Sequence, residues 1–152
     1  MKKICIALDT SPSAEKIATL GYEFAQALNA EVILVHVVYD VSMYVSDYDP
    51  IMQYDGFLIK NNMDLIEDIH KEAEKFLIAT AKFLGEPDLE TKVLDGNTHD
   101  EILDFAKTWE ADLLVFGTHS HSRWENLLLG NIATKLVKHS TVPLLVVPIR
   151  NS

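Results

Sequence analysis

Two glycines near the C-terminus are spaced in a way that could bind phosphate. Gly117 ends the apolar run 113–116, a polar loop follows, and Gly130 opens a segment with helical apolar periodicity. A glycine at a strand end lets backbone N–H groups approach an anion, and the positive end of a helix dipole favours negative charge. The pattern therefore predicts a phosphate site made of strand, glycine turn, loop and helix start.

The familiar phosphate motifs do not account for these glycines. The chain has neither Gly-x-Gly-x-x-Gly nor Gly-x4-Gly-Lys-Ser/Thr, which excludes the dinucleotide fingerprint and the P-loop in their usual forms. It has instead Gly117, two residues, Ser120, nine residues, and then Gly130-Asn131.

Other chemistries fit the loop less well. His119 and His121 could supply two imidazole ligands to a metal, but a closed zinc site takes four, so we expect no tightly bound metal. Ser120 and Ser122 lack the Gly-x-Ser-x-Gly elbow of a serine hydrolase. No general base is evident in the loop, so we expect no enzyme activity beyond slow hydrolysis of a phosphate compound that binds there.

Three other residues could do chemistry or could serve the fold. Asp9 follows the first apolar run, where its carboxylate could accept hydrogen bonds from sugar hydroxyls or could form an Asx turn before a helix. His36 lies in an apolar run and is interpreted as a hydrogen-bonded core histidine. Cys5, the single cysteine, is interpreted as a small buried hydrophobe.

Charge and length restrict the class of protein. The formal net charge is −10, which disfavours binding to nucleic acid or to an anionic membrane, while a local array of amides still attracts phosphate at short range. The first apolar run is too short for a signal peptide, and no stretch approaches the roughly 20 apolar residues of a membrane helix. We expect one cytoplasmic domain over residues 1–152.

The elements that position these residues alternate between strands and helices. Strands are expected at 3–8, 31–38, 89–94, 113–116 and 142–148, the last with two prolines that suit a sheet edge. The first helix is predicted to have Ser11 as N-cap and Pro12 as its first residue, with an apolar stripe of Ile17, Leu20, Gly21, Phe24 and Leu28.

The later helices have their own start and stop signals. A helix over 64–84 with Leu65 in its apolar stripe should stop at Gly85, and Thr98 with Glu101 predicts a capping box that opens the next helix. The last helix should cover about 130–139. Between the second strand and 64, residues 39–62 show no sustained period, so they are expected to form a loop that acts as a lid, a partner surface or a poorly ordered insertion.

Together these elements predict an α/β fold, a doubly wound open five-stranded parallel sheet of Rossmann-like type with helices on both faces. With the strand order 3-2-1-4-5, ligands bind where the order reverses, between the first and fourth strands. Asp9-Thr10 and Gly117-Thr118 end those two strands, so residues far apart in the sequence should meet in one crevice.

The glycine spacing resembles that of the universal stress protein family, whose nucleotide-binding members have Gly-x2-Gly-x9-Gly-Ser/Thr after the fourth strand. The resemblance extends to Asp9-Thr-Ser-Pro12, to Asp95-Gly96 and to the ending Val142-Pro-Leu-Leu-Val-Val-Pro148. Two identities differ, because Ser120 replaces a glycine and Asn131 replaces a hydroxyl residue. If position 120 needs a positive φ, serine there costs roughly 1–2 kcal/mol.

The resemblance implies a dimeric stress-response regulator that binds ATP or AMP, with Mg²⁺ where phosphates require it. The site it implies contains Ala7, Asp9, Thr10, Val37, Phe116, Gly117, His119, Ser120, Gly130, Asn131 and Ile132. It also implies a homodimer through residues 142–148. The alternative is a nucleotide-free dimeric interaction protein of the same family, with a protein partner at the loop 39–62.

Overall fold

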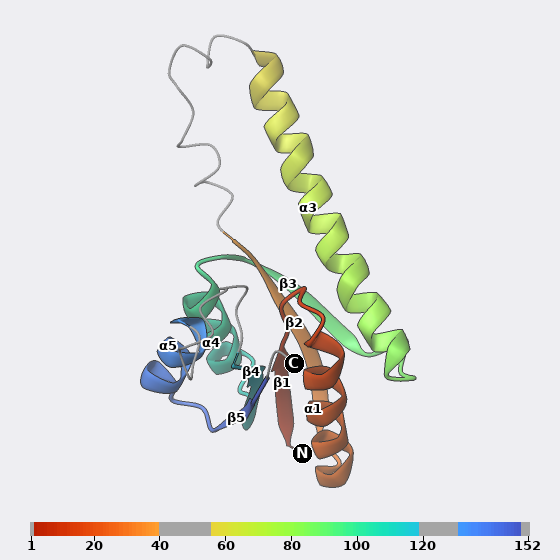
Figure 1. Cartoon of the computed structure of the whole chain (residues 1–152), viewed down its shortest axis with the longest axis vertical. Coiled ribbons are helices and arrows are strands. Elements are labelled where there is room, and N and C mark those ends of the chain that lie inside the picture. Colours follow the sequence, from red (N-terminus) through yellow and green to blue (C-terminus); the bar gives the residue numbers. More distant parts are fainter. Residues whose placement is uncertain (1, 40–55, 119–130, 150–152) are drawn as a thin grey trace.

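The centre of the molecule is a five-stranded parallel sheet in the order β3-β2-β1-β4-β5, as predicted (Figure 1). The computed structural model describes residues 2–39, 56–118 and 131–149. The strands are β1 (Lys3–Ala7), β2 (Glu31–Tyr39), β3 (Glu90–Gly96), β4 (Leu113–Gly117) and β5 (Leu144–Val147). β3 and β5 are the two edges, which agrees with the polar residues of the first and the prolines around the second.

Helices cover both faces of this sheet. They are α1 (Ala14–Leu28), α3 (Gly56–Phe83), α4 (Thr98–Thr108) and α5 (Asn131–His139). In Figure 1, α1 and α3 lie on one side of the strands and α4 and α5 on the other. No helix in the described part of the chain is both long enough and apolar enough to cross a bilayer.

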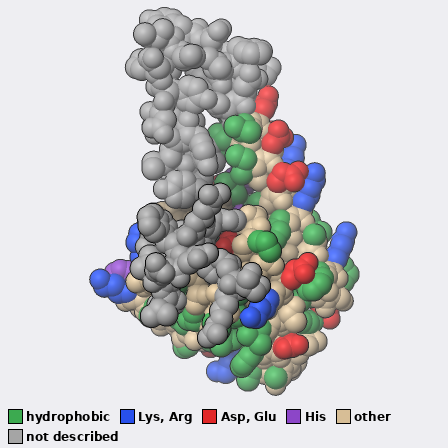
Figure 2. All heavy atoms as spheres, viewed as in Figure 1, with side chains coloured by type: hydrophobic (Ala, Val, Ile, Leu, Met, Phe, Trp, Pro, Cys, Tyr) green, Lys and Arg blue, Asp and Glu red, His purple; other side chains and the backbone are tan. Residues whose placement is uncertain are grey.

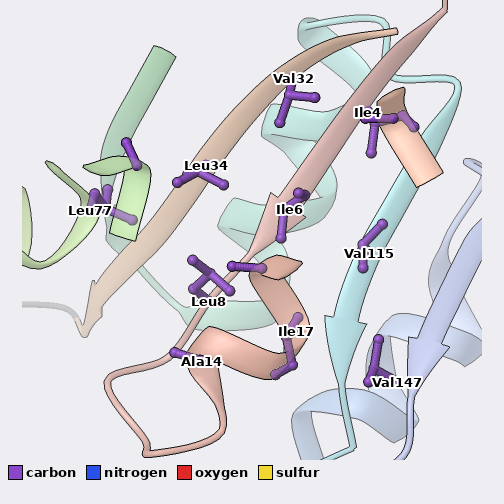
Figure 3. Packing of buried hydrophobic residues seen from close by; sticks show 13 residues of the cluster. Ile4, Ile6, Leu8, Ala14, Ile17, Val32, Leu34, Leu77, Val115 and Val147 are labelled. Carbon is purple, nitrogen blue, oxygen red and sulfur yellow. The ribbon is translucent and has the colours of Figure 1, made fainter. Parts of the chain in front are cut away.

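Alternate residues of the central strand, β1, belong to two separate hydrophobic cores. Ile4 and Ile6 pack towards α1 and α3, whereas Cys5 and Ala7 pack towards α4 and α5. Figure 3 shows the first of these cores, where Ile17 of α1 and Leu77 of α3 meet residues of the strands. After Lys3, β1 is buried on both faces, so residues 4–7 are a continuous apolar run without polar alternation.

The first helix begins later than predicted. Ser11 and Pro12 precede it, Ser13 is the N-cap, and α1 starts at Ala14. The expected cap at Ser11 is wrong because this serine belongs to a turn, in which its Oγ accepts a hydrogen bond from the Ser13 amide at 3.3 Å. The chain therefore needs two more residues to leave the sheet before it can form a helix.

The inward face of α1 is also rotated from the predicted stripe. Its buried residues are Ala14, Ile17, Ala18, Gly21 and Ala25, whereas Phe24 and Leu28 are exposed. The small residues bring the helix close to the sheet: a Cβ built on Gly21 would lie 2.8 Å from Cδ1 of Ile6. Close packing, rather than the largest side chains, decides which face turns inward.

The long helix α3 starts at Gly56, so the prediction of a loop as far as residue 62 is wrong. Nothing between Gly56 and Asp64 breaks a helix, since Pro50 lies earlier in the chain. Leu65, expected in the buried stripe, is exposed. The predicted stop is confirmed: Gly85 has φ +82°, and the Glu86 amide donates to the carbonyl of Ala81.

The predicted capping box of α4 is not formed. Asn97 is the N-cap, without a side-chain cap bond, and Thr98 is already the first helical residue. β3 runs as far as Gly96, so a single residue separates the strand from the helix. The Glu101 side chain lies against Gly96 instead of returning to the cap.

Candidate functional site

A cavity of about 170 Å³ lies at the carboxyl ends of the strands, mainly on the face covered by α4 and α5. Its residues come from β1, β2 and β4, from the turn after β1, and from α1, α4 and α5. This is the place where the strand order reverses, since β1 lies between β2 and β4. The apolar walls are formed mainly by Ala7, Val35, Val37, Ile102, Phe116, Ala133 and Leu136.

Several predicted site residues meet in this cavity. Those that line it are Ala7, Asp9, Val37, Phe116, Gly117 and Ile132. Thr10 follows Asp9 but is not a lining residue, and Asn131 is the first residue of α5. His119, Ser120 and Gly130 lie outside the described residues, as do His121, Ser122 and most of the predicted 39–62 loop. The two remote halves of the predicted crevice therefore do converge.

Other lining residues were not predicted. They are Leu8, Ile17, Val35, His36, Thr98, Ile102, Ala133 and Leu136. Most are apolar residues of regular elements, which a sequence does not distinguish from plain core. Thr98 had a usable signal, because it opens a helix directly after a strand, which is the geometry of an anion site.

Asp9 forms the turn that was one of its two interpretations. Its Oδ1 accepts a hydrogen bond from the Ser11 amide at 3.0 Å, which is an Asx turn before α1. The same residue lines the cavity. Its Oδ2 makes no hydrogen bond to any residue in the described ranges, so the turn leaves one carboxylate oxygen for a ligand.

His36 ties the end of β2 to the end of β1. Its Nδ1 lies 2.7 Å from the carbonyl oxygen of Leu8, so this nitrogen carries the proton and donates. The ring packs edge-on against Phe76, with 5.7 Å between ring centroids. His36 is hydrogen-bonded, as predicted, but it is half-buried and lines the cavity instead of lying in the core. It thereby fixes the chain immediately before Asp9.

Gly117 is needed for packing as well as for its position at the strand end. A Cβ there would collide with Cδ1 of Ile17 and lie 3.3 Å from Cγ1 of Ile149. The next residue, Thr118, joins β4 to the chain after β5: its amide donates to the carbonyl of Val147 at 3.0 Å, and its Oγ1 accepts from the Ile149 amide at 2.9 Å.

Two helices begin at the cavity, and they differ in charge. Thr98 opens α4, whose first turn already carries Asp100 and Glu101. Ile132 lies in the first turn of α5, which has no acidic residue. Carboxylates in a first turn offset the positive end of the helix dipole. The amino end of α5 is therefore the more attractive of the two for an anion.

Within residues 2–39, 56–118 and 131–149, no group of three or more His, Cys, Asp or Glu residues could hold a metal ion. Besides its apolar walls, the described cavity offers three polar side-chain groups: the carboxylate of Asp9, the imidazole of His36 and the hydroxyl of Thr98.

A sequence model of the universal stress protein family matches residues 1–148. The chain belongs to the universal stress protein family. Among curated relatives in the family, universal stress protein MJ0531 of Methanocaldococcus jannaschii is 32% identical over 149 residues, covering 96% of this chain and 81% of the relative. Universal stress protein A of Escherichia coli K12 is 31% identical over 150 residues, covering 99% and 96%.

Solved structures of the family share this fold. Universal stress protein UspA from Lactobacillus plantarum has a TM-score of 0.77 at 23% identity, covering 96% of this chain and 97% of that one. A universal stress protein in complex with cAMP has a TM-score of 0.63 at 23% identity, with 97% and 96% covered. One from Archaeoglobus fulgidus in complex with dAMP has a TM-score of 0.60 at 19% identity, with 96% and 97% covered.

Proposed function

We propose that this universal stress protein binds an adenine nucleotide, ATP or AMP, with the base in the cavity between β1, β2 and β4. The observation that carries the proposal is the cavity itself, which has apolar walls and lies where the strand order reverses. Asp9 on one side and Gly117 on the other come from the two strands that diverge there. Open α/β sheets bind their ligands at this position.

The size of the cavity suits a base rather than a whole nucleotide. Pockets for complete small-molecule ligands usually span roughly 300–1,000 Å³, whereas an apolar cavity of roughly 150 Å³ is enough for benzene. At about 170 Å³, this cavity admits one aromatic ring system. The ribose then lies beside Asp9, whose remaining carboxylate oxygen accepts from a sugar hydroxyl.

The phosphates extend from Gly117 towards the amino end of α5. That helix has no acidic residue in its first turn, so its dipole is available to an anion. We propose that the backbone amides of His119, Ser120, Gly130 and Asn131 contribute to this part of the site. Any Mg²⁺ would arrive with the phosphates, because it is usually bound through one or two carboxylates and substrate phosphates.

Related proteins support the choice of nucleotide. Structures of the same fold have been solved with cAMP and with dAMP, both of which contain adenine. We expect ATP to be hydrolysed slowly at most, since Asp9, the single carboxylate among the described lining residues, is held in a turn and is assigned to the ribose.

Calorimetric titration with ATP and AMP tests the proposal, with Asp9→Asn and Asp9→Ala as paired variants. Asparagine keeps an oxygen for the Ser11 amide, so only Asp9→Ala should lose the turn. A hydrogen bond to a charged group contributes about 1.5–3 kcal/mol, so both variants should bind about 10–100-fold more weakly. Absence of binding at millimolar ATP and AMP would refute the proposal.

We also propose a cytoplasmic homodimer formed through residues 142–148. β5 pairs with β4 on one side, and as an edge strand it leaves the other side for a second copy. Light scattering should give twice the 17.1 kDa chain mass. A monomeric mass at micromolar concentration would contradict this.

A further inference from the structure

The apolar stripe that packs α3 onto the sheet continues past the sheet. Ala73 and Leu77 are buried, Ile66 and Ile69 are half-buried, and Met63 is 66% exposed. The stripe keeps its helical spacing throughout, so the residues near Met63 have the pattern of a core-facing helix. Figure 1 shows the amino-terminal half of α3 extending beyond the strands.

This part of the stripe forms a surface, which we call the α3 ridge: Met63, Leu65, Ile66 and Ile69. At 100° per residue, Met63 and Leu65 mark the two edges of a mainly apolar arc with Ile66 near its centre. His70, which is half-buried and paired with Asp95, lies in the same arc. Leu65 is 54% exposed. A helix face this wide and apolar is typical of one that packs against another element.

Acidic residues border the ridge. Glu67 lies one turn from Met63, and Asp68 one turn from Leu65, and both are exposed. From residue 63 to 75 the helix carries five carboxylates and two lysines: Asp64, Glu67, Asp68, Glu72, Glu74, Lys71 and Lys75. Both lysines pair with carboxylates of α3 itself, Lys71 with Glu67 and Lys75 with Glu72, each at 3.2 Å. Figure 2 shows acidic and apolar side chains next to each other along this part of α3.

These charges select among the possible occupants. A second copy of the chain would place the same acidic borders against each other, and like charges across a helix pair are unfavourable. Anionic membranes and nucleic acids are repelled for the same reason. An apolar stripe flanked by Lys and Arg would match both the ridge and its borders.

We propose that the α3 ridge is a docking surface for a basic amphipathic helix of a protein partner. The apolar stripe of the partner covers Met63, Leu65, Ile66 and Ile69, and its cations face Glu67 and Asp68. No described residue of α3 lines the nucleotide cavity, and the proposal does not depend on the proposed nucleotide binding.

The test uses the full chain and two labelled synthetic helical peptides of equal length, one with a leucine stripe flanked by lysines and one with the same stripe flanked by glutamates. Fluorescence anisotropy should show binding of the basic peptide with micromolar Kd and at least tenfold weaker binding of the acidic peptide. Met63→Glu/Leu65→Glu should weaken the basic peptide at least tenfold. Ile78→Glu/Phe83→Glu, exposed apolar positions further along the same helix, should change it less than twofold.

A second pair of variants distinguishes the effect of the acidic border of the ridge from the effect of the overall net charge of −10. Glu67→Lys/Asp68→Lys and Glu15→Lys/Glu23→Lys change the net charge equally, but the second pair lies on α1 and is exposed. Only the first pair should weaken binding of the basic peptide, by about tenfold. All variants should keep the circular dichroism and the ATP affinity of the unaltered chain.

Three results would overturn the proposal. They are equal affinity for the two peptides, equal losses in ridge and control variants, or a self-associated species that Met63→Glu/Leu65→Glu dissolves in the absence of peptide. Failure of ATP binding with intact peptide binding would reject the proposed nucleotide function alone.

Discussion

At the scale of single residues, Gly117 has two structural roles that a sequence pattern cannot distinguish. It ends β4 beside the cavity, and it also leaves room for Ile17 of α1, which lines the same cavity. We predict that Gly117→Ala lowers the free energy of unfolding by about 1–3 kcal/mol, because the new methyl group overpacks the contact. Urea denaturation measures the loss.

The double variant identifies the cause of that loss. Ile17→Val removes the Cδ1 atom that the new methyl group would meet, so Gly117→Ala should be less destabilising in the Ile17→Val background. Gly85→Ala is the control: nothing lies within 4 Å of its Cβ, and φ of +82° makes its strain independent of Ile17. Strictly additive effects of Gly117→Ala and Ile17→Val would contradict the packing explanation.

The buried thiol of Cys5 should make the unfolding free energy depend on pH. Burial raises the pKa of its thiol to about 12, against roughly 8.5 in an unfolded chain. The folded pKa is the higher one, so the stabilisation is complete below about pH 8.5 and is lost as the pH rises towards 12. Within that window the unfolding free energy should fall by up to about 1.4 kcal/mol per pH unit more than in Cys5→Ala. Parallel urea curves for the two proteins from pH 8 to 10.5 would be inconsistent with this.

At the scale of elements, periodicity predicted all five strands, because buried parallel strands are short apolar runs between breakers. The strand order was predicted from the doubly wound fold type, and the edge positions from polar residues and prolines. It predicted helix starts poorly. Ser11 has the composition of a cap but serves a turn, and Gly56 starts a helix although glycine usually interrupts one. These outcomes depend on where the chain leaves the sheet, which no local window contains.

The candidate site was predictable only in part, for a related reason. Asp9 and Gly117 could be predicted, since they end the two strands that flank the reversal of strand order. His36 and Thr98 reach the same cavity from β2 and from the start of α4. Their placement depends on the register between β2 and β3, which sets Val38 beside Asp95. This register is part of the tertiary structure and is not contained in either segment of sequence alone.

An acidic substitution at the amino end of α5 should raise the stability of the protein and lower its affinity for ATP. Asn131 is its first residue, and an acidic residue there interacts favourably with the helix dipole. We predict that Asn131→Asp raises the unfolding free energy by about 0.3–1 kcal/mol while it weakens ATP binding at least tenfold through repulsion of the phosphates. Lys138→Glu at the other end of the same helix should lower stability and leave ATP binding unchanged. Unaltered ATP affinity in Asn131→Asp would remove α5 from the phosphate site.

At the scale of the whole molecule, the sheet separates two cores with different duties. The core under α1 and α3 contains Leu77, which does not line the cavity, whereas the core under α4 and α5 contains Leu136 and supplies most of the cavity walls. The proposed partner surface belongs to α3, whereas the proposed nucleotide site has most of its walls on the opposite face. A ligand that binds only the folded chain stabilises it by about 2.7 kcal/mol at a hundred times its Kd.

That separation can be tested with a matched pair of truncations. Leu77 and Leu136 are almost completely buried, at 0% and 1% exposure, so Leu77→Ala and Leu136→Ala should each cost about 2–5 kcal/mol. Only Leu136→Ala enlarges the cavity and removes contacts with the base. Saturating ATP should therefore raise the Tm of Leu77→Ala as much as that of the unaltered chain, but the Tm of Leu136→Ala clearly less. Equal losses of the ATP-induced shift in both would mean that the two faces of the sheet are coupled.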